Sequence, residues 1–508
     1  MKRRIFALSS IALVIATASG YWRWQKRKKD WRYDLPQNEL LEQVAQLPLI
    51  QPTLLKKRLL GLNVNWIEQS RLRRDLTRLS NLLHQFGGNV TRDSLEWAWV
   101  QQTMNGPYVR DRFVTAAEDH IRSTYKNNEI ESLRLLCYGN NAYWRGETMP
   151  TTAVFSQFIK GFIAYTLHIM EDQPNTRLFE VWNEWNLTAH FKGNEEIRRG
   201  SLYAQLFVHT AAAIHKKRPD AMAITQGLAI SKEANGLPDN EFLVRTLNHP
   251  GVLQSADGIG LHPYFFKIHG SPERLMNYLV FTRQQLLREV KGYSERTLPF
   301  FITETGFPTA EKSNFSIGSS WGYGIDETLQ AAFLVRLAIL CISQPYVQGL
   351  IFHNFVDSGD NKEDIEHNFG LLHNDLTPKL AWRRLAVLIP VLIQASEFEW
   401  FIGQAAEVAG SVKEAFDASI SPIYAVRFRC GSNRWCTAVW ATTSKSSTVR
   451  VMLPQGTNSL EVCEKQFDLE PNTFSNTASG HISIKLGLEP VYITQMQETK
   501  PEFLQIMI

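Results

Sequence analysis

The chain has 508 residues, 44% of them hydrophobic and 20% charged, a composition that indicates a folded protein with a large core, in two domains, rather than a disordered one. Its net charge of +4 is uneven, because residues 1–32 hold nine Lys and Arg against one Asp, which leaves 45 basic and 49 acidic residues for the rest. The body of the chain is therefore slightly acidic, which argues against nucleic acid as a partner.

The N-terminus has the pattern of an export signal. Lys2, Arg3 and Arg4 precede 18 uncharged residues, 5–22, with small residues suited to cleavage at 16–18. Basic residues at 26–29 disfavour cleavage, and a segment of this length just spans a bilayer. We therefore expect residues 1–29 to be either a cleaved signal peptide or an uncleaved membrane anchor through residues 5–22. A cytosolic chain with an unusual N-terminus is the third alternative. The two main alternatives predict an exported, periplasmic or otherwise extracytoplasmic protein, anchored in the inner membrane if uncleaved.

Residues 30–58 read as a linker or N-terminal extension, and from 59 to 395 short apolar runs alternate with helical periodicity. The expected strands are Leu60–Trp66, Asn89–Asp93, Leu133–Tyr138, Leu178–Asn183, Ala221–Gln226, Gly258–His262, Phe300–Glu304 and Leu350–Asn354. The expected helices include Arg71–Phe86, Thr151–Glu171, Ile197–Lys217, Pro272–Lys291, Asp326–Ser343 and Pro378–Gln394. Eight such units predict an α/β fold, a (β/α)8 TIM barrel, as the catalytic domain.

Beyond residue 395 the helical period fades, and residues 396–508 contain short β-rich runs separated by turns. This pattern predicts a small C-terminal antiparallel β-sandwich. Cys430 and Cys436 flank one of the turns, so they either pair across a hairpin or remain two buried thiols. Five cysteines are too few for a disulfide framework in this chain, and no Cys/His cluster has the spacing of a metal site.

Two glutamates end predicted strands at the barrel's C-terminal face, where TIM-barrel enzymes carry their chemistry. Glu184 follows the run from Leu178, and Glu304 follows the run from Leu298. Two carboxylic acids on opposite sides of one pocket are what cleavage of a glycosidic bond requires, one as general acid and one as nucleophile or base. We expect Arg92, at the end of another strand, to keep Glu304 ionised.

Aromatic and polar residues collect at the same strand ends. Sugar rings stack on flat aromatic side chains, and their hydroxyls need hydrogen-bonding partners, so this composition indicates a carbohydrate ligand. Besides the catalytic pair Glu184 and Glu304, the residues predicted to bind substrate are Arg92, Asn183, His262, Tyr264, Trp97, Trp144, Trp185, Trp321 and His353.

These residues resemble those of clan A glycoside hydrolases, which are TIM barrels with catalytic glutamates at the ends of strands 4 and 7. Asn183-Glu184 resembles the Asn-Glu acid/base motif of the clan, and Glu304 resembles its nucleophile. A barrel followed by a β-sandwich resembles family 39, which includes xylosidases and exopolysaccharide-processing endoglycosidases. One departure is that His353-Asn354 stands where clan members commonly have tryptophan, which puts the transfer of substrate from the family in doubt.

The resemblance implies a retaining O-glycosidase that needs no metal or organic cofactor and acts on a polysaccharide or oligosaccharide. The anchor and the aromatic residues favour endo action on an exported or envelope polymer. Two readings of another class remain open: a non-catalytic glycan-binding protein, and a scaffold of a polysaccharide-export complex. A transglycosidase is the alternative within the enzyme class.

Overall fold

A computed structural model describes residues 55, 57–125, 130–146, 148–187, 200–230, 239–264, 272–310, 325–402 and 423–442, together with the strands within 447–452, 459–463, 472–475, 481–496 and 505–507. The apolar segment 5–22, the extension 30–54 and Trp321 lie outside the described residues.

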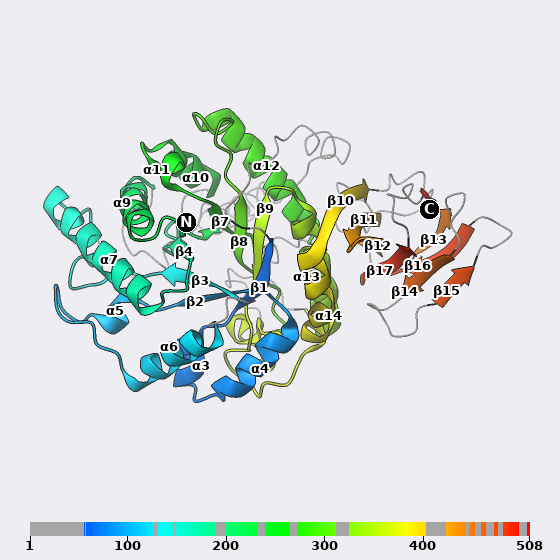
Figure 1. The fold of residues 1–508 in the computed structure, drawn as a ribbon, viewed down its shortest axis with the longest axis horizontal. Helices are drawn as coiled ribbons and strands as arrows, with labels where there is room; N and C mark the ends of the chain where they lie inside the picture. The colour runs from blue at the N-terminus through cyan, green and yellow to red at the C-terminus, as the bar shows by residue number, and fades with distance from the viewer. Residues whose placement is uncertain are drawn as a thin grey trace, which may run out of the picture.

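A curled parallel sheet with nine strand segments forms the larger part of the fold, in the order β5-β4-β3-β2-β1-β9-β8-β7-β6 (Figure 1). Its strands are β1 Leu59–Asn63, β2 Val90–Ser94, β3 Glu131–Leu136, β4 Leu178–Val181, β5 Met222–Ile224, β6 Leu228–Ala229, β7 Ile259–His262, β8 Phe300–Thr305 and β9 Val347–Phe352. Bridges Asn183↔Gly227 and Ile224↔Gly258 join the two ends of the sheet. Segments β5 and β6 therefore act as one strand, and the eight predicted strands curl into a TIM-like (β/α)8 barrel.

Helices surround the sheet (Figure 1). They are α3 Trp66–Arg71, α4 Leu76–Phe86, α5 Trp97–Val100, α6 Arg112–Thr124, α7 Thr152–Asp172, α9 Ser201–Lys217, α10 Asp239–Asn248, α11 Val252–Ser255, α12 Arg274–Glu289, α13 Glu327–Ser343 and α14 Leu380–Gln394, with a short 3₁₀ turn, η4, at Ile365–Asn368. Asp75, Asp111 and Asp326 each cap the start of a helix by accepting a hydrogen bond from its backbone.

Among the described helices, α7 is long and apolar enough to cross a membrane by length and composition. It packs beside α9 in the outer ring and buries Phe158, Phe162 and Tyr165 against the barrel. The packing of α7 against the barrel therefore explains its apolar composition.

The barrel interior changes from apolar to polar along its axis. Side chains two positions apart on a strand point to the same side, so Val90 and Arg92 on β2 share a face, as do Leu178 and Glu180 on β4. An apolar cluster of Leu59, Val90, Leu133, Leu178, Met222, Ile224, Phe301 and Ile351 fills the end at which the strands begin. The polar residues lie beyond this cluster, toward the carboxyl ends of the strands. The barrel interior beneath them is therefore a packed apolar layer.

The C-terminal part contains a six-stranded antiparallel sheet, in the order β10-β11-β12-β17-β14-β15, and a three-stranded sheet, β16-β13-β18. The strands are β10 Ala395–Ile402, β11 Ile423–Cys430, β12 Arg434–Ala441, β13 Ser447–Met452, β14 Ser459–Cys463, β15 Asn472–Ser475, β16 His481–Leu486, β17 Val491–Met496 and β18 Gln505–Met507. The antiparallel strands are confirmed, whereas their packing as a sandwich stays a prediction. The register places Cys436 opposite Phe428, not opposite Cys430.

The six-stranded sheet packs on the barrel through α13 and α14 (Figure 1). Tyr424 and Trp440 from the sheet belong to the same apolar core as the barrel helices. The indole Nε1 of Trp440 donates to Oε1 of Glu273 at 2.8 Å, and Nε of Arg336 on α13 donates to the same oxygen at 2.8 Å. Glu273 and Arg336 are both buried, so this ion pair is sealed between barrel and sheet.

Candidate active site

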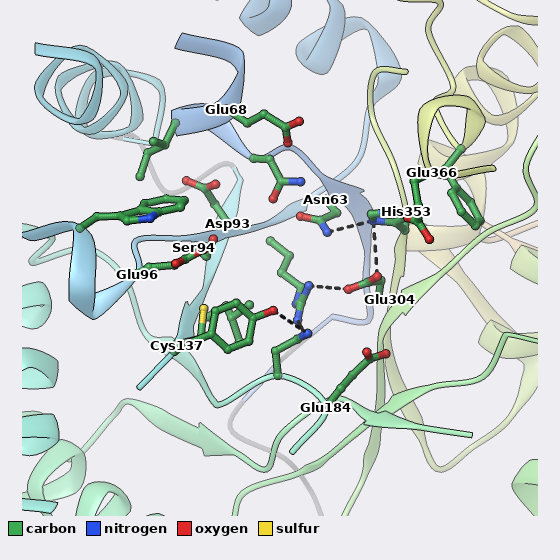
Figure 2. A pocket seen from close by; sticks show the side chains of 18 of the residues that line it. Asn63, Glu68, Asp93, Ser94, Glu96, Cys137, Glu184, Glu304, His353 and Glu366 are labelled. Atoms are coloured by element: carbon green, nitrogen blue, oxygen red, sulfur yellow. Dashed lines mark hydrogen bonds and ion pairs between the residues drawn. The ribbon is translucent and has the colours of Figure 1, made fainter. Parts of the chain in front are cut away.

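A cavity of about 420 Å³ opens among the carboxyl ends of the barrel strands (Figure 2). Its lining comes chiefly from the ends of β1, β2, β3, β4, β7, β8 and β9 and the segments that follow them. The lining residues are Asn63, Asn65, Ile67, Glu68, Arg92, Asp93, Ser94, Glu96, Trp99, Leu135, Cys137, Tyr138, Asn183, Glu184, Tyr264, Glu304, His353, Glu366 and Phe369. Both predicted catalytic glutamates therefore face one space.

Arg92 at the end of β2 is held by three groups from two other strands. Its Nε donates to Oε2 of Glu180 at 2.6 Å, its Nη1 to Oε2 of Glu304 at 2.9 Å, and its Nη2 to Oδ1 of Asn183 at 2.7 Å. Arg92 and Glu180 are almost fully buried. The planar guanidinium thereby fixes the ends of β2, β4 and β8 relative to one another.

Glu304 receives a second hydrogen bond, from the phenol of Tyr264. The Tyr264 Oη lies 2.6 Å from Oε1 of Glu304, and Nδ1 of His353 lies 3.5 Å from the same oxygen. Burial, and then the charge of Glu304, raises the pKa of Tyr264 well above its usual value. The phenol thus stays protonated and donates its proton to the carboxylate.

The pKa of Glu304 lies well below its usual value, at about 2. Burial alone would raise it, but the charges of His353, His262 and Arg92 outweigh burial and the repulsion from Glu184. Burial also lowers the pKa of His353, so at neutral pH the permanent charge of Arg92 is the dependable partner. Glu304 is therefore ionised throughout the neutral range.

Glu184 lies against the imidazole of His262, whose Nδ1 is 2.9 Å from Oε1 of Glu184. On the other side of the ring, Nε2 lies 3.1 Å from Oγ1 of Thr303, and this hydroxyl donates to Oε1 of Glu180 at 2.7 Å. Because the single hydroxyl proton of Thr303 goes to Glu180, Nε2 of His262 must carry a proton and donate it to Thr303. The contact between Nδ1 of His262 and Oε1 of Glu184 therefore needs one proton, carried by the ring or by the carboxyl.

The backbone around Glu184 is held in an unusual conformation. Trp182 and Glu184 have φ of 77° and 47°, values that L-residues rarely adopt and that the surroundings must stabilise. The amide of Glu184 donates to the carbonyl of Gly227 at 3.1 Å, and the amide of Trp185 donates to the side chain of Gln226 at 2.5 Å. The neighbouring strand thus directs the Glu184 carboxyl toward the cavity.

The two carboxyl groups lie close together. Glu184 Oε1 and Glu304 Oε2 are 2.9 and 3.8 Å from the same nitrogen, Nδ1 of His262, so these oxygens are at most about 6.7 Å apart. Retaining glycosidases hold their carboxyl groups about 5–5.5 Å apart, and inverting ones about 6.5–9.5 Å. The bound on this one pair of oxygens is compatible with the retaining spacing.

Asn183 also reaches the cavity. Its Oδ1 accepts from Arg92, and its Nδ2 donates to the phenol of Tyr138 at 3.1 Å. Burial raises the pKa of Tyr138 well above its usual value, so this phenol too stays neutral. Arg92, Asn183, Tyr264 and His353 therefore all line the cavity with the two glutamates, and His262 supports it from behind.

Three tryptophans predicted to bind substrate are instead part of the core. Trp97, Trp144 and Trp185 are buried and do not line the cavity. Trp97 packs among Phe158, Phe162 and Tyr165 of α7 and its neighbours, Trp144 packs on Phe155 and Phe158, and Trp185 packs on Trp182 and Tyr203. The lining aromatic from this region is Trp99, which is partly exposed.

Sequence reasoning did not single out Asn63, Glu180 or Thr303. Glu180 had one available signal, since a charge inside the apolar run of β4 faces the barrel interior and requires a partner. Asn63 ends β1, and its Nδ2 lies 3.2 Å from Nδ1 of His353. Within the part of the chain that the structure describes, no group of three or more His, Cys, Asp or Glu side chains is arranged to hold a metal ion.

No protein-family model matches the sequence, and no curated protein matches it either. Among solved structures, a family 39 glycoside hydrolase from Bacteroides cellulosilyticus WH2 has a TM-score of 0.64 and 20% identity, over 88% of this chain and 83% of that one. A GH39 β-xylosidase from Caulobacter crescentus has a TM-score of 0.53 and 15% identity, over 89% and 98% of the two chains. A GH30 endoxylanase from Clostridium papyrosolvens C71 has a TM-score of 0.50 and 9% identity, over 89% and 98%. The chain therefore has the fold of family 39 and family 30 glycoside hydrolases, which confirms at the level of the fold the resemblance to clan A.

Proposed function

We propose that this chain is a retaining O-glycosidase in which Glu304 is the nucleophile and Glu184 the acid/base. The observation that carries the proposal is that two carboxyl groups share one cavity, one of them held ionised and the other beside a proton. Glu304 is held ionised by Arg92 at 2.9 Å, whereas the hydrogen-bond chain through His262 and Thr303 supplies a proton between His262 and Glu184.

The first step forms a bond between a Glu304 oxygen and the anomeric carbon while the bond to the leaving oxygen breaks. The proton on Glu184 moves to that leaving oxygen. In the second step Glu184 removes a proton from water, whose oxygen attacks the anomeric carbon and releases Glu304. We infer that Asn183, which Arg92 and Tyr138 hold by hydrogen bonds, contacts the sugar 2-hydroxyl.

The barrel residues 59–395 form the catalytic domain in this proposal, and residues 396–508 form the accompanying β-sandwich. The fold relatives include enzymes named as a xylosidase and an endoxylanase, which supports a glycan as substrate. We infer endo action on an exported or envelope polysaccharide from the lining aromatic Trp99 and from the apolar N-terminal segment, read as a signal peptide or anchor.

The test is hydrolysis of a panel of aryl glycosides and polysaccharides by residues 31–508, with the anomeric configuration of the first product followed by proton NMR. We expect sugar release with retained configuration in the wild type and a loss of at least about 10⁴-fold in Glu304→Gln. Glu363→Gln is the matched control, because Glu363 is exposed and does not line the cavity.

Each other outcome has a definite meaning. A product with inverted anomeric configuration would show that Glu304 is not the nucleophile. Sugar transferred to an acceptor in place of water would indicate a transglycosidase. Glycan binding without release of sugar from any substrate would favour the non-catalytic glycan-binding alternative.

A further inference from the structure

One wall of the cavity presents mainly hydrogen-bond acceptors. This acceptor wall consists of Asn63 at the end of β1, Glu68 on α3, Asp93 at the end of β2 and Glu96 before α5. Figure 2 shows Glu68, Asp93 and Glu96 across the cavity from Glu184 and Glu304. The three acids of the acceptor wall thus face the substrate from another side than the pair that breaks the bond, whereas Asn63 lies beside His353, which contacts Glu304.

Asn63 contributes a buried acceptor without a hydrogen-bond donor among the residues that the structure describes. Asn63 is 3% exposed, and its Oδ1 accepts no hydrogen bond from any described residue. Its Nδ2 is occupied, because it donates to Nδ1 of His353, whose pKa burial lowers so that the ring is neutral. A buried carbonyl oxygen without a donor costs about 1–3 kcal/mol, and a ligand that donates to it removes this cost.

The charge of the cavity favours a cation. The acids among its lining residues are Glu68, Asp93, Glu96, Glu184, Glu304 and Glu366, and the basic residues are Arg92 and His353. Arg92 is fully engaged by Glu180, Glu304 and Asn183. Arg134 pairs with Asp93 from behind, whereas the charge of Arg74 only partly offsets the burial of Glu68.

Glu68 is partly buried, and Arg74, the cation that acts on its charge, is hydrogen-bonded to other groups. Arg74 donates to the side chains of Gln69 and Asn374 and to the carbonyl of Asp357 at 2.7 Å. Burial raises the pKa of Glu68, and Arg74 offsets this only in part. A positive ligand group near Glu68 would therefore gain more than at a solvated carboxylate.

We propose that the acceptor wall binds the ammonium group of an amino sugar, so that the substrate is a hexosamine glycan with free amines. This inference rests on the glycosidase function proposed above. An ammonium supplies three donors and a positive charge, which suit a wall of acceptors that includes the carboxylate of Glu68. An N-acetyl group is neutral, and its carbonyl oxygen, a hydrogen-bond acceptor, would face the acceptors of the wall. A uronate brings a like charge, which is repelled.

A neutral sugar is the competing ligand, because its hydroxyls also donate to carboxylates. The test therefore compares sugars that differ at one group. Binding to Glu304→Gln is measured by calorimetry for methyl glycosides of glucosamine and galactosamine, their N-acetyl forms, the neutral parents and the corresponding uronates. We expect an amino sugar to bind about tenfold or more tightly than its neutral parent, in line with hydrogen bonds to charged groups.

Two further variants test the role of Glu68 in the same background. Glu68→Gln should remove most of the preference for the amine, and Glu68→Lys should shift the preference toward the uronate. Glu363→Gln should keep the preference, since that exposed acid lies outside the cavity lining. Melting temperatures of all variants show whether a loss of binding is a loss of folding.

Amino sugars that bind no more tightly than neutral parents, including no detectable binding of either, would overturn the proposal. A preference that survives Glu68→Gln would overturn it as well. Failure of the glycosidase function looks different: in that case the wild type hydrolyses nothing, whereas hydrolysis of neutral glycosides that is lost in Glu304→Gln keeps the function and discards only the amine site.

Discussion

Nδ1 of His262 lies 2.9 Å from Oε1 of Glu184, and this contact contains one proton whichever of the two groups carries it. The opposite nitrogen of the ring is committed to Thr303, whose own proton is committed to Glu180. A chain of hydrogen bonds that ends at a buried carboxylate therefore holds one proton beside Glu184, where the proposed mechanism needs it for the leaving group.

Replacing Glu184 should slow reactions according to the leaving group. In Glu184→Ala, substrates with a poor leaving group should lose about 10²–10⁴ in kcat/KM, because they need the proton in the first transition state. Activated aryl glycosides should lose much less in that first step, which burst kinetics separates from turnover of the intermediate. Equal losses for good and poor leaving groups would contradict the assignment of the acid.

Glu304 should make stability depend on pH in a specific window. Its pKa in the folded protein is lowered from 4.5 to about 2, so its contribution to stability is present above pH 4.5 and is lost as the pH falls toward 2. The difference in melting temperature between wild type and Glu304→Gln should therefore shrink through this window. A difference that grows as the pH falls would show that the carboxylate is not stabilised by its neighbours.

Arg92 should be needed both for stability and for activity, and the two effects can be separated. Arg92→Met leaves Glu180 buried without its cation and should cost about 3–5 kcal/mol in the free energy of unfolding. Adding Glu180→Gln removes that charge and keeps an acceptor for Thr303, so the double variant should regain much of the stability.

Activity should stay low in the double variant, since Glu304 still lacks the cation that holds it ionised. Urea denaturation and aryl glycoside hydrolysis measure the two effects. A double variant as unstable as Arg92→Met would mean that Glu180 is not the group left uncompensated.

Trp97 and Trp99 should respond in opposite ways to substitution by alanine. Trp97 is fully buried and donates to Gln101 at 2.8 Å, so Trp97→Ala should cost about 3–5 kcal/mol in stability. Trp99 lines the cavity beneath the guanidinium of Arg71, which lies 4.2 Å from its ring. Trp99→Ala should leave the melting temperature nearly unchanged and raise KM by up to about tenfold, a loss typical of one aromatic contact. The opposite pattern would reverse the two roles.

The same two residues show where sequence reasoning ends. Alternating apolar runs were sufficient to predict the eight barrel strands and their order along the chain, and strand ends were sufficient to locate Glu184 and Glu304. Trp97 and Trp99 lie two positions apart on α5, about 200° around the helix axis, so one faces the core and the other the cavity. Their identity and spacing do not say which, because packing of α7 decides it.

Partners distant in sequence were the other part that could not be predicted. The need of Glu180 for a cation is visible in its apolar surroundings. Its link to His262 and Thr303, however, requires β4, β7 and β8 to be in register. The orphan oxygen of Asn63 is likewise a property of the assembled site, since only the position of His353 determines which end of the amide is occupied.

The contact of Trp440 with Glu273 determines how the chain can be divided. A fragment that ended with α14 would lose the indole donor, open the Glu273–Arg336 pair to water and uncover the apolar sides of α13 and α14 that face the sheet (Figure 1). Glu273 lies directly before α12, in the connection that leads there from β7, the strand that ends at His262. Chimaeras and shortened versions of this protein therefore need to keep the C-terminal sheet together with its own barrel. The alternative is to replace both sides of the buried contact between Trp440, Glu273 and Arg336 together.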